Sequence, residues 1–192
     1  MHSSAVELLA ALRAVLDRLG MRWYLFGAQA VIAYGAPRLT ADVDVTVELG
    51  PHTPEALVAE LATARFRPRV HDVGEFARRT RVLPFVHEPS ALPLDVVLAG
   101  PGPEEEFLAR ARPIRFGDVD VPVIAREDLV AVKILAGRPQ DLQDAAAIVH
   151  AAGEALDLAL VRATLGLFES ALDRRDLVSA FERIVRRAQR AK

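Results

Sequence analysis

The stretch that decides the fold is WYLFGAQAVIAYGAPRLTADVDVTVE, residues 23–48. An apolar segment typical of a buried strand leads through a turn of small residues into a short helix, and a Pro-Arg loop then leads into the alternating segment DVDVTV. Side chains alternate between the faces of a strand, so Asp42 and Asp44 are predicted to project from one face. Because two carboxylates on one face repel each other, a divalent metal ion is the obvious counter-charge.

The composition of the 192 residues is that of an ordinary globular protein, with 52% apolar and 26% charged residues. A net charge of −2 gives no overall electrostatic footprint for nucleic acid, so any such contact must be a local patch. No apolar run approaches a membrane span, and the N-terminus lacks the features of a signal peptide. Without cysteine there is no disulfide framework or thiolate metal site. We therefore expect a cytoplasmic protein without a membrane segment.

Hydrophobic periodicity predicts a core at 1–125 and a helical region at 126–192 that packs on it as one compact unit. In the core we expect helices at 3–19, 28–34, 55–64, 73–79 and 103–111, and strands at 22–26, 42–48, 66–70, 81–87, 92–98, 113–116 and 119–124. Pro84 and Pro93 indicate edge positions or strand starts. Beyond the core we expect only helices, at 126–136, 140–152, 157–169 and 174–190. The class is α+β or α/β with a helical tail.

A third acid, Asp95, lies alone in the apolar segment LPLDVVL, where an unpaired carboxylate is rarely tolerated. Three carboxylates on strands are the minimum for two-metal phosphoryl or nucleotidyl transfer. The Gly27-Ala28 turn opens a helix whose N–H groups suit a phosphate, and Arg38 and Thr40 lie within chain reach. The alternative for Asp42 and Asp44 is an amphipathic strand with two solvated acids.

Lysine is rare in this sequence, which otherwise uses arginine as its basic residue. The two lysines are Lys133 and the terminal Lys192. Because an ammonium is a compact point charge and a guanidinium is a planar fork, the internal lysine suggests a specific task.

These residues together resemble the nucleotidyltransferase superfamily of DNA polymerase β type, in which a small-residue turn precedes a D-x-D strand and a third Asp follows. The run REDLVAVKILAGRPQDLQD at 126–144 narrows the resemblance to AbiEii-like nucleotidyltransferases, toxin components of bacterial toxin–antitoxin and phage-abortive systems. The resemblance spans about residues 20–150. It implies an α+β fold with an α/β-type core, in which helices flank a mixed sheet, and a C-terminal helical extension.

The resemblance also implies roles for single residues. Asp42 and Asp44 would hold Mg²⁺, and Asp95 would share a metal, in a site that could take two ions, and activate the attacking hydroxyl. The residues implied in nucleotide binding are Gly27, Ala28, Arg38, Thr40, Lys133, Arg138 and Asp141, with Lys133 also counted as catalytic. Arg138 and Asp141 would belong to the site or brace it, and Asp144 is as well explained as structural.

The implied reaction transfers NMP from an NTP to an acceptor hydroxyl, which in a toxin could be a tRNA 3′ end, with an antitoxin protein as a partner. Ala28 departs from the family pattern, which has Ser or a second Gly there, although Gln29 could substitute for the missing hydroxyl. Two alternatives therefore stay open. One is a degenerate, non-catalytic nucleotide- or partner-binding module, and the other is a small-molecule nucleotidyltransferase of the antibiotic-modifying kind.

The remaining polar residues give weaker signals. The five histidines lack metal-ligand spacing and are mostly expected at the surface or in turns; they are His2, His52, His71, His87 and His150. The last two helices are rich in arginine, which indicates a solvated face or a patch for an RNA acceptor; these residues are Arg174, Arg175, Arg183, Arg186, Arg187 and Arg190.

Overall fold

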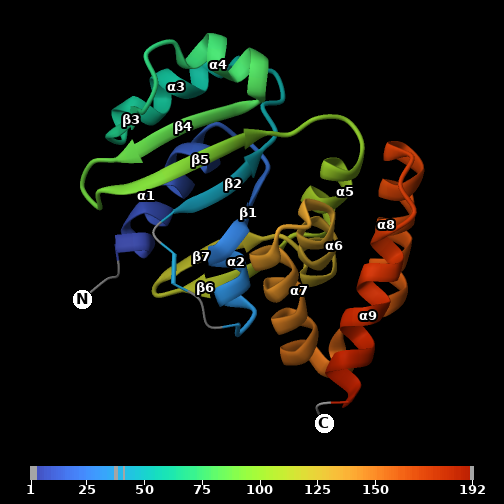
Figure 1. The fold of residues 1–192 in the computed structure, drawn as a ribbon. Helices are drawn as coiled ribbons and strands as arrows, with labels where there is room; N and C mark the ends of the chain where they lie inside the picture. Colours follow the sequence, from blue (N-terminus) through green and yellow to red (C-terminus); the bar gives the residue numbers. More distant parts are fainter. Residues whose placement is uncertain (1–3, 37–38, 41, 191–192) are drawn as a thin grey trace. The chain divides into compact units, whose positions relative to one another are not determined.

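A computed structural model describes residues 4–36, 39–40 and 42–190 (Figure 1). The chain divides into two compact units. Unit 1 comprises Met1–Gln29 and Leu39–Ile124, and unit 2 comprises Ala30–Arg38 and Ala125–Lys192. Helix α2 (Gly27–Ala33) begins in the first unit and ends in the second.

Unit 1 is built on a seven-stranded sheet with the strand order β3-β4-β5-β2-β1-β7-β6. The strands are β1 (Trp23–Phe26), β2 (Val43–Val47), β3 (Phe66–Pro68), β4 (Val82–His87), β5 (Leu92–Leu98), β6 (Arg112–Phe116) and β7 (Val119–Val123). The pairs β2/β5 and β1/β7 are parallel and the others are antiparallel, so the sheet is mixed. With its helices this confirms the predicted α+β class.

The helices of unit 1 are α1 (Ser4–Arg18), α3 (Pro54–Thr63), α4 (Val73–Thr80) and α5 (Pro103–Arg110). Helix α1 buries one apolar stripe against β5, β7 and α3, and Leu8, Leu12 and Leu16 on it are fully buried. Thr53 is the N-cap of α3, and its hydroxyl accepts a hydrogen bond from the Ala56 N–H at 3.2 Å. Residues 66–100 contain the one helix and the three strands predicted there, as α4, β3, β4 and β5.

The expectation that Pro84 marks an edge strand is wrong, because β4 lies between β3 and β5. The carbonyl of Pro84 accepts the N–H of Arg69 at 2.9 Å, just after β3 ends at Pro68. An extended residue directs its N–H and C=O toward the same neighbour, so the missing donor of Pro84 faces the end of a three-residue strand. An interior strand therefore tolerates proline here. Pro93, the second residue of β5, agrees with the expected strand start.

Unit 2 is helical beyond α2. Its helices are α6 (Arg126–Ala136), α7 (Pro139–Ala152), α8 (Leu158–Leu172) and α9 (Leu177–Arg190), with a short 3₁₀ turn η1 (Gly153–Ala155) after α7. Helix α6 packs on α7, α8 and α9, and α9 also packs on α7 and α8 (Figure 1). Gly137 ends α6 in a left-handed conformation, and Pro139 begins α7 at its first position.

In unit 2 the largest differences from the predicted boundaries lie at the end of α8 and the start of α9. Helix α8 continues to Leu172, and α9 begins at Leu177 rather than at residue 174. The reason is local: Asp173 adopts a left-handed conformation, and Arg174 Nη2 pairs with Asp176 at 2.7 Å in the turn. None of the helices in the described ranges is long and apolar enough to cross a membrane.

Candidate active site

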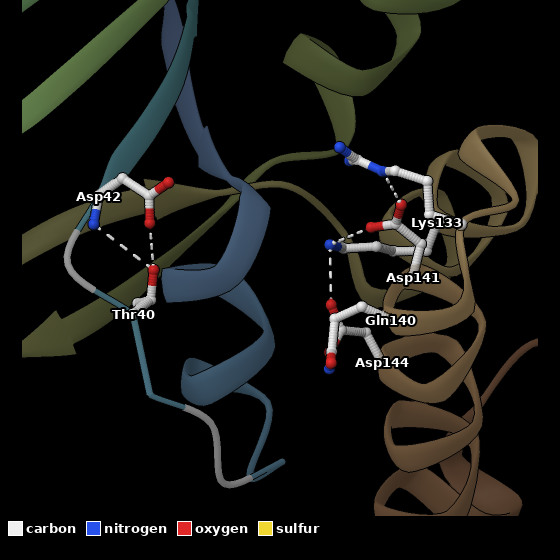
Figure 2. A network of polar contacts seen from close by, with 7 residues as sticks. Thr40, Asp42, Lys133, Gln140, Asp141 and Asp144 are labelled. Atoms are coloured by element: carbon white, nitrogen blue, oxygen red, sulfur yellow. Dashed lines mark hydrogen bonds and ion pairs between the residues drawn. The ribbon is translucent and has the colours of Figure 1, made fainter.

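The two acids of the D-x-D segment lie at the start of β2. Asp42 directly precedes the strand and is exposed, Val43 is fully buried, and Asp44 is half-buried. This alternation is what two acids on one face require. The hydroxyl of Thr40 donates a hydrogen bond to the Asp42 carboxylate and lies 3.5 Å from the Asp42 N–H (Figure 2). Thr40 therefore orients Asp42, and its predicted contact with nucleotide stays a prediction.

Gly27 lies directly against the second acid. Strands β1 and β2 pair with Phe26 opposite Asp44, which brings the next residue beside the Asp44 side chain. Gly27 has a φ of +64°, and a Cβ atom at this position would lie 2.0 Å from Asp44 Oδ2. Any side chain would therefore displace the carboxylate. The sequence pointed to Gly27 for its turn and its N–H group, and the close approach to Asp44 adds a steric reason.

The third acid lies beside Asp44 on the neighbouring strand. Strands β2 and β5 run parallel with Asp44 and Asp95 as register partners. Asp95 is half-buried between the fully buried Leu94 and Val96, so β5 has one buried face and one partly open face. The sequence suggested that Asp95 lies in a strand buried on both faces. Instead, the alternation of side chains places Asp95 on the partly open face of β5.

Asp95 has a partner that sequence reasoning missed. Arg69 Nη2 donates to Asp95 Oδ1, and Arg69 Nε donates to the carbonyl of Phe85 at 2.9 Å. The sequence indicated only that the Asp95 carboxylate, in an apolar segment, needs a cation as its partner. With arginine abundant throughout the chain, only the register of β3, β4 and β5 identifies which one supplies it.

The donor atoms of this acidic group suit Mg²⁺, which prefers carboxylate oxygens. Asp42 and Asp44 supply such oxygens, and Gly27 has no side chain that would displace the Asp44 carboxylate. Within the described ranges, however, no three histidine or acidic side chains are gathered closely enough to hold one ion. The pairing of Asp95 with Arg69 agrees with this, and joint metal binding by all three acids stays a prediction.

The predicted residues of unit 2 form a second group, in which two buried acids surround Lys133 (Figure 2). Lys133 Nζ lies 2.8 Å from Asp141 Oδ1 and 2.9 Å from Asp144 Oδ2, joining α6 to α7. Arg138 Nε lies 2.5 Å from Asp141 Oδ2, and Gln140 Nε2 donates to Asp144 Oδ1 at 3.2 Å. The solitary internal lysine is thus held by two carboxylates.

The electrostatics of this group favour its charged form. Burial raises the pKa of the Asp141 carboxyl group, but hydrogen bonds from Lys133 and Arg138 outweigh that effect and hold the pKa below its ordinary value. The two cations differ in exposure, because 9% of the Lys133 side chain and 77% of the Arg138 side chain are exposed. Arg138 is the cation of this pair that solvent and ligands can reach.

Other predicted residues fall into less informative places. Ala28 and Gln29 are both buried at the start of α2. Arg38 lies outside the described residues. Most histidines were expected at the surface or in turns, but His87 is buried in β4. Its Nδ1 lies 2.8 Å from Ser90 Oγ, and its ring centroid lies 4.6 Å from that of Phe66. Burial lowers the pKa of this imidazole.

Several solved structures have a similar fold, among them the following three. The antibiotic-resistance factor ANT(2″)-Ia is 16% identical, with a TM-score of 0.61 over 90% of this chain and 95% of that chain. An antigenic nucleotidyltransferase-like protein from Paracoccidioides brasiliensis is 18% identical, with a TM-score of 0.59 over 94% of each chain. The lincosamide antibiotic adenylyltransferase LnuA is 13% identical, with a TM-score of 0.53 over 77% of this chain and 98% of that chain. At these identities the likeness concerns the fold.

A comparison of the sequence with curated proteins gives no significant match. Among protein families, the sequence matches the family described as nucleotidyl transferase AbiEii toxin, type IV toxin–antitoxin system, over residues 8–192. Since that match covers nearly the entire chain and the fold is that of nucleotidyltransferases, this protein belongs to the AbiEii nucleotidyltransferase toxin family.

Proposed function

We propose that this protein transfers a nucleoside monophosphate from an NTP to an acceptor hydroxyl in a Mg²⁺-dependent reaction, and that it acts as the toxin of a toxin–antitoxin pair. The observation that carries the proposal is the group of three acids in unit 1, Asp42, Asp44 and Asp95. There Asp44 and Asp95 are register partners on parallel strands, Asp42 precedes them, and Gly27 lies against Asp44. Membership of the AbiEii family supports the reaction type.

The chain's own residues account for binding and proton transfer. Asp42 and Asp44 would hold Mg²⁺, which supplies positive charge to the phosphates of the nucleotide. The Asp95 carboxylate would accept the proton of the attacking hydroxyl, since it lies on the adjacent strand, beside Asp44. The backbone N–H groups of Gly27 and Ala28 would donate to phosphate oxygens, because the first N–H groups of a helix have no partner within it.

Two basic residues of unit 2 are further candidates for contact with nucleotide phosphate. We assign contact with phosphate to Arg138, whose side chain is largely exposed, and Lys133 would add positive charge to the same group. Asp141 holds both cations in place through its two oxygens. Arg38, which precedes the Asp42-Val-Asp44 segment in the sequence, would add a third cation.

The test is transfer of label from each of the four α-labelled NTPs to total tRNA in the presence of Mg²⁺. We expect the wild-type protein to label RNA, and Asp42→Asn and Asp44→Asn each to lower the rate about 1,000-fold, since several kcal/mol of charge stabilisation is lost. The control is Asp17→Asn, an exposed acid on α1 that pairs with Arg13. It should label RNA like the wild type, and circular dichroism should show that all three variants are folded.

Transfer at the wild-type rate by either Asp42→Asn or Asp44→Asn would reject the proposal. A second acceptor class is tested in parallel with aminoglycoside and lincosamide substrates, because two of the similar folds belong to antibiotic-modifying proteins. Label on the antibiotic but not on RNA would replace the RNA acceptor with a small molecule. Nucleotide binding without transfer to any acceptor would favour a non-catalytic module, for which Ala28 is the sequence argument.

A further inference from the structure

We propose that the guanidinium of Arg69 takes the place of a second metal ion beside Asp95, so that this site binds a single divalent cation, at Asp42 and Asp44. Asp95 then acts as a metal-free carboxylate that Arg69 positions. The inference rests on the proposed function, because it assumes a metal at the first two acids. It changes what the third acid does.

Arg69 is attached to the sheet at three points. It follows β3, and its backbone N–H donates to the carbonyl of Pro84 at 2.9 Å. Its Nε donates to the carbonyl of Phe85 at 2.9 Å, and its Nη2 donates to Asp95 Oδ1. Pro84 is the register partner of Asp95, so the backbone anchor lies across the β4/β5 ladder from the acid. A side chain fixed at Nε presents Nη2 to the carboxylate in one orientation.

The charge of Arg69 opposes a metal at the same carboxylate. A guanidinium stays protonated at every pH of interest, so it cannot relieve the repulsion by releasing a proton, as a lysine could. Mg²⁺ requires oxygens in near-octahedral positions at short range, and Asp95 Oδ1 is already engaged by Nη2. Among the described residues, no three histidine or acidic side chains form a group that could hold a metal ion, which fits this arrangement.

The consequence for the reaction is a division of labour among the acids. The hydroxyl oxygen of the acceptor bonds to the α-phosphorus, the bond from phosphorus to the leaving pyrophosphate breaks, and pyrophosphate leaves with the electron pair. The proton of the hydroxyl passes to Asp95, whose Oδ1 is held by Arg69. Arg69 is therefore a positioning residue.

The test is the stoichiometry of Mn²⁺ binding to the full-length protein, measured by calorimetry and by electron paramagnetic resonance of the free ion. We expect one Mn²⁺ for the wild type and two for Arg69→Gln, in which Asp95 is released for a second ion. Asp95→Asn should still bind one Mn²⁺ with the wild-type affinity. The matched control is Arg67→Gln, because Arg67 lies on the adjacent strand β3 and pairs with Glu88 instead. It should bind one ion.

Two Mn²⁺ ions on the wild type, none on the wild type, or loss of an ion in Asp95→Asn would each overturn the inference. The Asp95→Asn result decides the matter even if Arg69→Gln fails to fold, since that variant keeps Arg69. Binding of one ion by Arg69→Gln, once shown to be folded, would also contradict it. Failure of the proposed function is seen separately, as absence of NMP transfer by a protein that shows the expected metal stoichiometry.

Discussion

Gly27 is the residue whose environment is most restrictive. Its φ of +64° favours glycine, and an added Cβ would meet Asp44 Oδ2 at 2.0 Å. These two constraints are separable, because Gly20 has the same φ of +64° and no atom within 4 Å of an added Cβ. A pair of alanine variants can therefore distinguish backbone strain from displacement of the carboxylate.

We expect Gly27→Ala to weaken Mn²⁺ binding about 10-fold or more, since groups that orient a metal ligand have effects of that size. Gly20→Ala should cost about 1 kcal/mol of folding free energy and leave Mn²⁺ affinity unchanged. Calorimetry gives the affinities, and urea denaturation gives the free energies of unfolding. Equal Mn²⁺ affinities in the two variants would show that the approach of Gly27 to Asp44 is unimportant.

His87 gives the fold a pH dependence of predictable sign. Burial lowers the pKa of its imidazole in the folded state, so the unfolded chain binds more protons between that pKa and about 6.5. The stabilisation is therefore complete above about pH 6.5 and declines as the pH falls toward the folded pKa. Nearby Glu7 opposes the effect, and Arg65 adds to it.

We expect His87→Gln to flatten the dependence of unfolding free energy on pH below about 6.5, the ordinary pKa of an imidazole. Urea denaturation at a series of pH values measures this. His71→Gln is the control, because His71 is exposed. An unchanged slope in His87→Gln would show that His87 is not the group responsible.

At the scale of elements, α6 and α7 are joined by the buried group around Lys133. Removing the ammonium leaves Asp141 and Asp144, each with 4% of its side chain exposed, without their shared cation. Because the folded pKa of Asp141 is lowered, its stabilisation is present above about pH 3.9 and is lost as the pH falls through the folded value. At neutral pH the link is therefore fully formed.

We expect Lys133→Met to lower the free energy of unfolding by about 3–5 kcal/mol, the cost of removing one partner of a buried ion pair. Arg186→Met on the exposed face of α9 should change it by less than about 0.5 kcal/mol. Urea denaturation at pH 7 compares the two. A loss as small as that of the control would indicate that Lys133 is free to serve a ligand and does not brace the helices.

At the scale of the whole molecule, the division into units does not follow the chain. Residues 30–38 belong to unit 2, although they lie within the first 125 residues. The Tyr34 ring makes a cation–π contact within unit 2, since Arg126 Cζ lies 5.4 Å from the ring centroid. Ala33, Tyr34 and Gly35 also line a cavity of about 290 Å³ together with Ile148 and Ala152 of α7.

We expect Tyr34→Ala to destabilise unit 2 by about 1–2 kcal/mol, through lost burial and a lost cation–π contact. Hydrogen exchange should show faster exchange of the amides of α6 and α7. Phe76→Ala, on α4 of unit 1, is the control and should leave those amides unchanged. Unchanged exchange in Tyr34→Ala would mean that residues 30–38 contribute nothing to the stability of unit 2.

The sequence by itself determined the elements and the family. Periods of 2 and 3.6 residues locate the strands and helices, and the Asp42-Val-Asp44 segment, Asp95 and Lys133 stand out because each breaks a local pattern. Local pattern also accounts for caps such as Thr53, whose partner lies three residues away. These features depend on neighbours in the chain, which the sequence displays directly.

Only the tertiary structure decided which distant residues meet. It paired Asp95 with Arg69, placed Asp44 beside Asp95, buried His87 and set Pro84 in an interior strand. It also assigned residues 30–38 to unit 2. Each of these outcomes depends on strand order and register, which are settled by packing over the whole sheet, and a chain with many arginines offers many equivalent partners until that packing is known.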